Sequence, residues 1–218
     1  MKVAIVSESP ADEAAVLVLL EGLLQQPIEV FSSPTVRGRP GGWSGVLNTI
    51  PKVLRHLHYW TDAAALVAVL DSDRSAVHQA AHDAPNAADP ACRLCQLRSE
   101  VARIRGILRP VEGRQPIKIA LGLAVPQVEA WYVTGQDPHV SEAAWLNGLR
   151  SGTLPYDSKW LKTKVYRTDR PSLDLETQRA REEAERIVRD GKLPLLERLF
   201  QGGFGALAAD VRAWRTGQ

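Results

Sequence analysis

The sequence predicts an α/β protein, with a mostly parallel sheet flanked by helices and a C-terminal helical extension. Two short apolar runs each lead into acidic residues, and the first of them continues into a helical pattern. Apolar runs without polar alternation are typical of strands buried on both faces, as in parallel sheets. Residues 136–218, in contrast, show mainly helical periodicity.

The first strand is expected at residues 3–6, and Glu8 follows it. Ser9, Pro10 and Asp12 then make a favourable helix start, with a capping serine, proline at the first helical position and an acid at the third. Apolar residues at helical spacing continue the pattern, namely Val16, Leu19, Leu20, Leu23 and Leu24. We therefore predict strand, acid and helix in that order.

The longest apolar run, residues 64–70, ends in Asp71 and Asp73. The carboxyl ends of strands in an open α/β sheet are where ligands bind, and closely spaced carboxylates suit Mg²⁺. If both strands are parallel, Glu8 emerges at the same edge, where the carboxylates repel unless a cation or Lys/Arg neutralises them. The alternative is an ordinary turn that uses aspartate for local hydrogen bonds.

Between these strands, residues 28–31 predict a short strand and residues 46–57 a helix kinked or restarted at Pro51. The intervening loop carries Arg37, Arg39 and Trp43. Guanidinium groups suit phosphate and tryptophan can stack on a base, so this loop is a candidate nucleic-acid contact. It is equally well an ordinary surface loop with its tryptophan packed against the body.

Beyond Asp73 the chain carries two histidines and both of its cysteines. His78 and His82 are four apart on an expected helix, and Cys92 and Cys95 have the spacing of a zinc knuckle. Two histidines and two cysteines are a standard tetrahedral Zn²⁺ set, which here would be structural because it closes the coordination shell. The alternatives are exposed histidines beside half-buried free thiols, or a redox pair.

A helix is expected at residues 99–108 and a further strand at residues 117–125, followed by Glu129. Glu8, Asp12, the Asp71-x-Asp73 pair and the strand that runs into Pro126-x-x-Glu129-Ala-Trp together resemble the Toprim family. The likeness is to OLD-family nucleases and stand-alone bacterial Toprim families, and it covers roughly residues 1–135. One position departs from the pattern, since Ser9 stands where the family usually has glycine.

The resemblance implies a Rossmann-like Toprim domain at 1–135. The His/Cys pattern adds a candidate zinc-binding insert at 76–97, and the helical periodicity predicts a mainly helical extension at 136–218. The resemblance also implies a metal-dependent nuclease, with Mg²⁺ or Mn²⁺ bound by Glu8, Asp71 and Asp73. Asp12 and Glu129 would complete a second metal site, although Glu129 also suits a helix first turn. A catalytic lysine is expected too, with Lys159, Lys162 and Lys164 as candidates. An ABC-type ATPase partner and a role in phage defence follow from the resemblance alone.

Residues 150–170 are basic with aromatic residues between, as a nucleic-acid track requires, although many surfaces share this composition. The basic residues are Arg150, Lys159, Lys162, Lys164, Arg167 and Arg170, and the aromatic ones are Tyr156, Trp160 and Tyr166. Ser172 caps a charged helix that ends near Gly191, and helices at 193–200 and 206–214 follow.

Composition limits the alternatives. The net charge is +2, so affinity for DNA or RNA must come from local patches, and no apolar run is long enough for a membrane span. We expect a cytoplasmic protein that binds nucleic acid and pairs with a second copy of itself. Its rivals are a non-catalytic Toprim binding or recombination-mediator module, and a phosphatase or nucleotide-sugar transferase that uses Asp71 and Asp73 differently.

Overall fold

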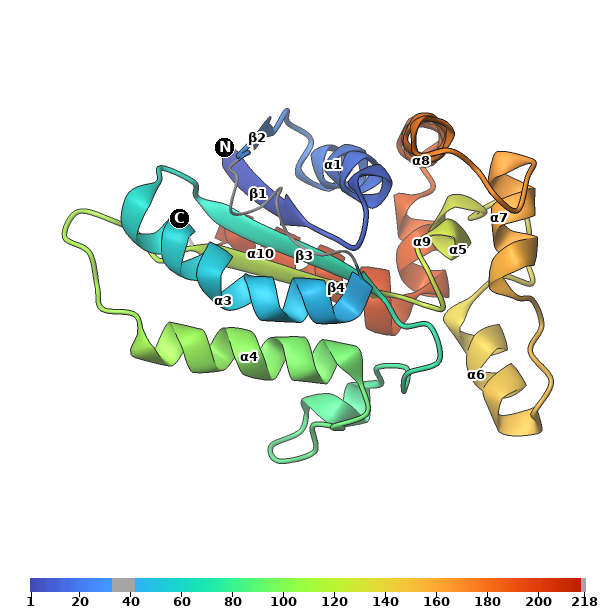
Figure 1. Ribbon diagram of the computed structural model, residues 1–218, viewed down its shortest axis with the longest axis horizontal. Coiled ribbons are helices and arrows are strands. Elements are labelled where there is room, and N and C mark those ends of the chain that lie inside the picture. The colour runs from blue at the N-terminus through green and yellow to red at the C-terminus, as the bar shows by residue number, and fades with distance from the viewer. Residues whose placement is uncertain (33–41, 217–218) are drawn as a thin grey trace.

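The computed structural model describes residues 1–32 and 42–216, and its centre is a four-stranded, all-parallel sheet with strand order β2-β1-β3-β4 (Figure 1). The strands are β1 (Lys2–Val6), β2 (Glu29–Val30), β3 (Ala65–Asp71) and β4 (Lys118–Ala124). The predicted α/β class with a parallel, Rossmann-like sheet is confirmed. β2 is shorter than predicted, since only Lys2 and Val3 of β1 pair with it.

β3 lies between β1 and β4, which explains its apolar sequence. Its residues pair in parallel register with β1 from Val3↔Ala65 onward and with β4 as far as Asp71↔Ala124. Ala65 to Leu70 are all buried, because helices cover both faces of the sheet. Asp71 is thus the last residue of a central strand, and its position is fixed by hydrogen bonds on both sides.

α1 (Pro10–Leu24) begins as predicted. The side chain of Ser9 accepts a hydrogen bond from the backbone N–H of Asp12, and the Asp12 side chain accepts one from the backbone N–H of Ser9. This reciprocal capping box satisfies two backbone donors that the helix would otherwise leave unpaired. It also fixes the Asp12 carboxylate close to the end of β1.

Two helices cover each face of the sheet (Figure 1). α3 (Gly42–Trp60) and α4 (Arg93–Ile107) pack together over β3 and β4, while α1 and α10 (Ala206–Thr216) lie on the other face. α3 runs through Pro51 as one helix, so the predicted restart there is wrong. No helix in the described ranges is long and apolar enough to cross a membrane.

The remaining helices gather beyond the carboxyl ends of the strands (Figure 1). They are α5 (Glu129–Tyr132), α6 (Glu142–Ser151), α7 (Ser158–Tyr166), α8 (Leu173–Arg189) and α9 (Leu193–Leu199). α8 packs along α1 through Ala180, Ala184 and Ile187, the thin apolar stripe seen in its sequence. A π-turn at Gln201–Gly205 connects α9 to α10.

The C-terminal helices are packed tightly onto the sheet. A Cβ atom on Gly203 would lie 1.9 Å from the carbonyl oxygen of Leu123 in β4, so no larger residue fits there. Lys118 and Trp214 add hydrogen bonds between β4 and α10. The extension therefore supplies α10, one of the two helices that cover this face of the sheet, as well as the helices beyond its carboxyl edge.

Candidate functional site

The acidic residues at the ends of β1 and β3 meet at one edge of the sheet. The Asp71 backbone N–H donates to Glu8 Oε1 at 3.1 Å, and Asp71 Oδ1 accepts from the Val128 backbone N–H at 2.9 Å. The backbone N–H of Asp73 donates to the carbonyl of Pro126 at 2.7 Å. The turn after β3 is therefore held against the segment after β4, which brings Asp71, Asp73 and Glu129 to the same edge.

These carboxylates carry more negative charge than their surroundings neutralise. Burial raises the pKa of Asp71 well above its usual value, and the nearby charges of Asp12, Glu129, Glu8 and Asp73 raise it further. Burial and the charge of Glu129 raise the pKa of Asp12 to about 7. Burial is also the main cause of the raised pKa values of Glu8 and Glu129. A set of carboxylates of this kind favours a bound cation.

Arg93, the first residue of α4, is the basic group closest to Asp73. Its Nη1 donates to the carbonyl oxygen of Asp71 at 2.6 Å and to Asp73 Oδ2 at 2.8 Å, and it lies 4.0 Å from Glu8 Oε1. Its guanidinium also lies 5.6 Å from the ring centroid of Trp43, which packs partly buried against the core. Arg93 neutralises one side of the site and leaves the buried Asp12–Asp71–Glu129 side without this counter-charge.

Glu129 lies on the far side of this edge, at the start of α5, with 7% of its surface exposed. The Tyr166 hydroxyl donates a hydrogen bond to it, and the charge of Lys162 lowers its pKa against the larger effect of burial. Lys162 also pairs with Glu176 at 3.4 Å. α7 thus presents one lysine and one tyrosine to the carboxylates.

The other two candidate lysines are engaged elsewhere. Lys159 is highly exposed and pairs with Asp169 at 3.2 Å, and Lys164 lies 3.9 Å from Asp137 and 5.6 Å from the ring centroid of Trp160. Arg167 is exposed at the end of α7, and Arg37 and Arg39 lie outside the described residues. Of the three lysines, Lys162 is the one whose charge acts on a carboxylate of the candidate site, Glu129.

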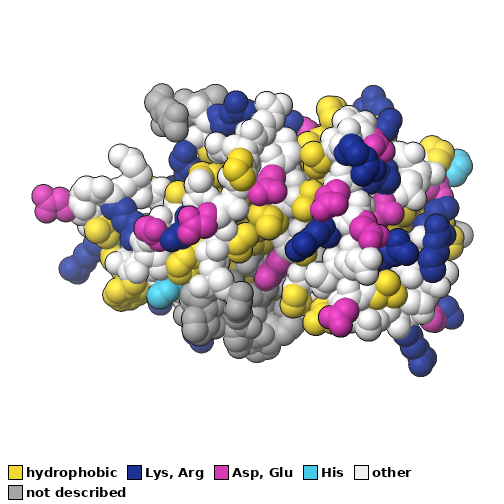
Figure 2. All heavy atoms as spheres, turned by 90° about the horizontal axis from the view of Figure 1, so that it is seen from above, with side chains coloured by type: hydrophobic (Ala, Val, Ile, Leu, Met, Phe, Trp, Pro, Cys, Tyr) yellow, Lys and Arg dark blue, Asp and Glu magenta, His cyan; other side chains and the backbone are white. Residues whose placement is uncertain are grey.

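The aromatic residues of the predicted nucleic-acid track are mostly buried. Tyr156 is 7% exposed and Tyr166 is 3% exposed, whereas Trp160 is 38% exposed. Figure 2, which views the molecule from the side of α1 and α8, shows basic and acidic side chains intermixed rather than one basic patch. A continuous stacking platform for bases is therefore not formed by these three residues.

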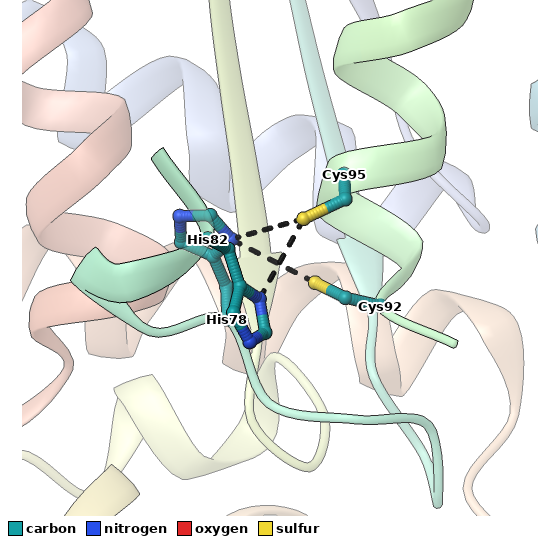
Figure 3. A group of neighbouring side chains, drawn as sticks. All are labelled: His78, His82, Cys92 and Cys95. Atoms are coloured by element: carbon teal, nitrogen blue, oxygen red, sulfur yellow. Dashed lines mark hydrogen bonds between the residues drawn. The ribbon is translucent and has the colours of Figure 1, made fainter. Parts of the chain in front are cut away.

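His78, His82, Cys92 and Cys95 converge on one point (Figure 3), with all four ligand atoms within 4.8 Å of one another. Cys92 Sγ lies 3.7 Å from His78 Nδ1, and Cys95 Sγ lies 3.6 Å from Nδ1 of both histidines. The four residues could bind a metal ion. The helix predicted for the two histidines is wrong, since His78 lies in an extended segment and His82 in a short 3₁₀ turn, Ala80–Asp83.

Carboxylates lie beyond both histidine rings of the cluster. Asp83 lies 3.2 Å from His78 Nε2, and Asp89 lies 3.9 Å from His82 Nε2, so both rings have a carboxylate on the side away from the cysteines. Metal-bound histidines commonly donate their second N–H to a carboxylate. Arg98 of α4 contacts both His78 Nε2, at 3.0 Å, and Asp83.

Reasoning from the sequence missed the contact of Arg93 with Asp73 and that of Tyr166 with Glu129, and it left the choice among the lysines open. Arg93 stands between the two cysteines, as Cys92-Arg93-Leu94-Cys95, so the residue that pairs with Asp73 is carried by the His/Cys cluster itself. The sequence offered one indication of its role, a basic residue between the two cysteines of a zinc-knuckle spacing. Linking it to the carboxylates required knowing that α4 starts beside the end of β3.

Comparisons of the chain with models of known protein families, with curated proteins and with solved structures found no match.

Proposed function

We propose that the protein is a divalent-metal-dependent phosphodiesterase that cleaves DNA or RNA. The observation that carries this proposal is the shared sheet edge of Glu8, Asp71 and Asp73, with Asp12 and Glu129 behind it. Burial and neighbouring acidic groups raise the pKa values of Asp12 and Asp71. Hard oxygen donors of this kind fit Mg²⁺ or Mn²⁺ and fit soft metals poorly. The resemblance to Toprim nucleases agrees with this assignment.

Glu8, Asp71 and Asp73 would hold one ion, and Asp12 and Glu129 are the candidates for a second. When bound, such ions would activate water as the nucleophile and stabilise charge on the attacking and leaving oxygens of an in-line displacement. Asp12 Oδ2 accepts a hydrogen bond from the Ser9 backbone N–H at the start of α1, so this carboxylate would serve the helix cap and the metal together.

The chain's own residues have separable roles in this proposal. Hydrogen bonds from Asp71 to Glu8 and from Val128 to Asp71 orient the carboxylates before substrate arrives. Arg93 has five N–H donors in a planar fork. Asp71 and Asp73 both accept from Nη1, so the donors on its other two nitrogens suit a phosphate oxygen. Lys162 is the lysine we assign to charge developing on the phosphoryl group.

Cleavage of supercoiled plasmid and of labelled single-stranded DNA and RNA with Mn²⁺ or Mg²⁺ tests the proposal. We expect strand cleavage by the wild type and a loss of at least about 100-fold in Asp71→Asn/Asp73→Asn, since the ion that activates water is no longer held. Asp62→Asn, which replaces an exposed aspartate paired with Lys2, is the matched control and should cleave normally. Cleavage that survives in the double variant would place the active site elsewhere.

We also propose that the His/Cys cluster binds structural Zn²⁺. Zinc bond lengths of about 2.3 Å to sulfur and about 2.0–2.1 Å to nitrogen, at a tetrahedral angle, separate sulfur and nitrogen by about 3.5–3.6 Å. The Sγ–Nδ1 distances of 3.6 and 3.7 Å agree with that value. Four protein ligands close the shell, which favours a structural role.

The competing proposal is a non-catalytic module that binds nucleic acid without cleaving it. It is favoured if wild-type protein binds DNA or RNA and cleaves neither with Mn²⁺. The ABC-type ATPase partner and the role in phage defence rest on the Toprim resemblance. If an ABC-type ATPase is encoded beside this chain, the cleavage assay is repeated with that ATPase added. Cleavage only in its presence would indicate a site that needs its partner, and no cleavage would indicate an inactive site.

A further inference from the structure

A basic side chain lies among the three residues that we assign to one metal ion. Arg93 Nη1 lies 2.6 Å from the carbonyl oxygen of Asp71, 2.8 Å from Asp73 Oδ2 and 4.0 Å from Glu8 Oε1. Mg²⁺ binds its oxygen ligands at about 2.0–2.1 Å, so an ion held by these residues would lie in the region that Nη1 fills. The guanidinium therefore stands where the proposed metal ion belongs.

This ion pairing is largely shielded from water. The side chains of Arg93 and Glu8 are only 18% and 17% exposed, so their charges are screened less than charges on an open surface. Asp73 has a second carboxylate oxygen, but an ion bound to that oxygen would still lie close to the guanidinium. Two cations so close together repel each other strongly where water is scarce. Arg93 and a divalent cation are thus alternative partners of the same carboxylates.

We propose that Arg93 is an internal counter-ion of the unliganded protein, which competes with a divalent cation for Glu8, Asp71 and Asp73. This inference rests on the proposed metal-dependent function and adds a regulation of that site. If Arg93 only organised the ligands, it would strengthen metal binding, whereas a competing cation weakens it. The two roles therefore predict opposite effects of removing Arg93.

The released side chain has space and a second partner. Arg93 and Asp73 both line a cavity of about 650 Å³, and the guanidinium lies 5.6 Å from the ring centroid of Trp43. Once the carboxylates no longer accept from Nη1, all the guanidinium donors are available to phosphate oxygens. A divalent cation at the carboxylates and a phosphate at Arg93 then favour each other, because each separates Arg93 from Asp73.

Mn²⁺ affinity, measured from the electron paramagnetic resonance signal of free Mn²⁺, tests the competition without any readout of cleavage. The protein is purified without chelators, so that metal at the His/Cys cluster is retained. Arg93→Gln keeps an amide donor and removes the charge, and we expect it to lower the Kd for Mn²⁺ at least about 10-fold. Arg93→Lys keeps the charge and should stay within about 3-fold of the wild type. Arg103→Gln, which changes an arginine of α4 paired with Glu100, is the matched control.

A measurement on the wild type does not depend on whether Arg93→Gln folds. The Arg93 N–H groups lose their carbonyl and carboxylate acceptors when a divalent cation takes the position. Saturating Mg²⁺ should therefore speed the exchange of the Arg93 guanidinium hydrogens with water, as observed by ¹⁵N NMR. Arg114 donates to the carbonyl oxygen of Leu57, near the other end of α3, and its hydrogens should exchange at an unchanged rate.

The outcomes separate the inference from the function on which it rests. Equal or weaker Mn²⁺ binding by folded Arg93→Gln, or unchanged exchange of the Arg93 hydrogens with Mg²⁺, would overturn the competition even if the wild type cleaves. Tighter binding by Arg93→Gln, with no cleavage by any of the proteins, would support the counter-ion and overturn the nuclease proposal. No Mn²⁺ binding by either protein at millimolar concentrations would overturn both.

Discussion

At the scale of single residues, Asp71 is the centre of the candidate site. It ends the central strand, bonds to Glu8 through its backbone N–H and to Val128 through its carboxylate, and has four acidic neighbours within electrostatic range. Folding without a bound cation must bring these charges together in a buried place, which destabilises the folded state. Function at this edge is therefore expected to cost stability.

Asp71→Asn should stabilise the unliganded protein at pH 8. A carboxyl whose pKa is raised on folding binds its proton more tightly in the native state, so the Asp71 carboxyl lowers stability as the pH rises above about 4, the usual aspartate value. We expect the variant to gain at least about 1 kcal/mol, or about 2–4 °C in Tm, at pH 8 and little at pH 4.

Thermal unfolding at both pH values, with and without Mn²⁺, measures this effect. Asp62→Asn serves as the control. The Asp62 carboxylate accepts a hydrogen bond from Lys2 Nζ, which lowers the Asp62 pKa, so this replacement should give no gain in stability at pH 8. Mn²⁺ should raise the Tm of the wild type and not that of Asp71→Asn. A variant less stable than the wild type at pH 8 would argue against uncompensated repulsion at this edge.

Lys162 and Lys159 provide a second test at this scale. Lys162→Met removes the cation whose charge acts on Glu129, whereas Lys159→Met removes an exposed cation paired with Asp169. We expect kcat for cleavage to fall about 100-fold in Lys162→Met and to change less than about 2-fold in Lys159→Met. Steady-state kinetics on a single-stranded substrate decide this, and the reverse ranking would transfer the role to Lys159.

At the scale of elements, the His/Cys cluster connects a loop, a 3₁₀ turn and the start of α4. His78 and His82 come from the segment after Asp73, and the two cysteines flank Arg93, which pairs with Asp73. A metal bound there would fix the distance between the turn after β3 and the first residue of α4. The cluster would thus position Arg93 without touching substrate itself.

His82→Asn should remove the bound zinc, while His56→Asn, which changes a histidine outside the cluster, should leave it in place. We expect about one zinc per wild-type chain by elemental analysis and a Tm lower by several degrees in His82→Asn, since binding energy is folding energy at structural sites. Full stability and no zinc in wild-type protein purified without chelators would contradict the zinc proposal.

Elements governed by local rules were predictable from sequence, and elements governed by tertiary contacts were not. The α1 capping box and the buried β3 run depend on neighbouring residues, and both were found. The spacing of His78 and His82 suggested one helix face, but the chain reaches the same convergence through an extended segment and a short turn. The roles of Arg93 and Lys162 depend on where α4 and α7 begin relative to the sheet, which no local pattern encodes.

At the scale of the whole molecule, the fold brings three features to one end of the sheet. The carboxylates follow β1 and β3, the His/Cys cluster lies at the start of α4 beside them, and the α6–α7 segment lines a cavity next to Asp73. The C-terminal helices are part of this arrangement, since α8 packs on α1 and α10 on β4. Truncation after residue 135 would therefore remove α10, which covers one face of the sheet, together with Lys162 and the α6–α7 wall of the cavity.

The most direct test of the central claim is a crystal structure of Mn²⁺-soaked protein, with anomalous difference maps recorded at the manganese edge. The account predicts a manganese peak within bonding distance of Glu8, Asp71 and Asp73, at the common edge of β1 and β3. A map with no manganese at these carboxylates, or with manganese only elsewhere on the molecule, would contradict the metal-dependent site on which the proposed function depends.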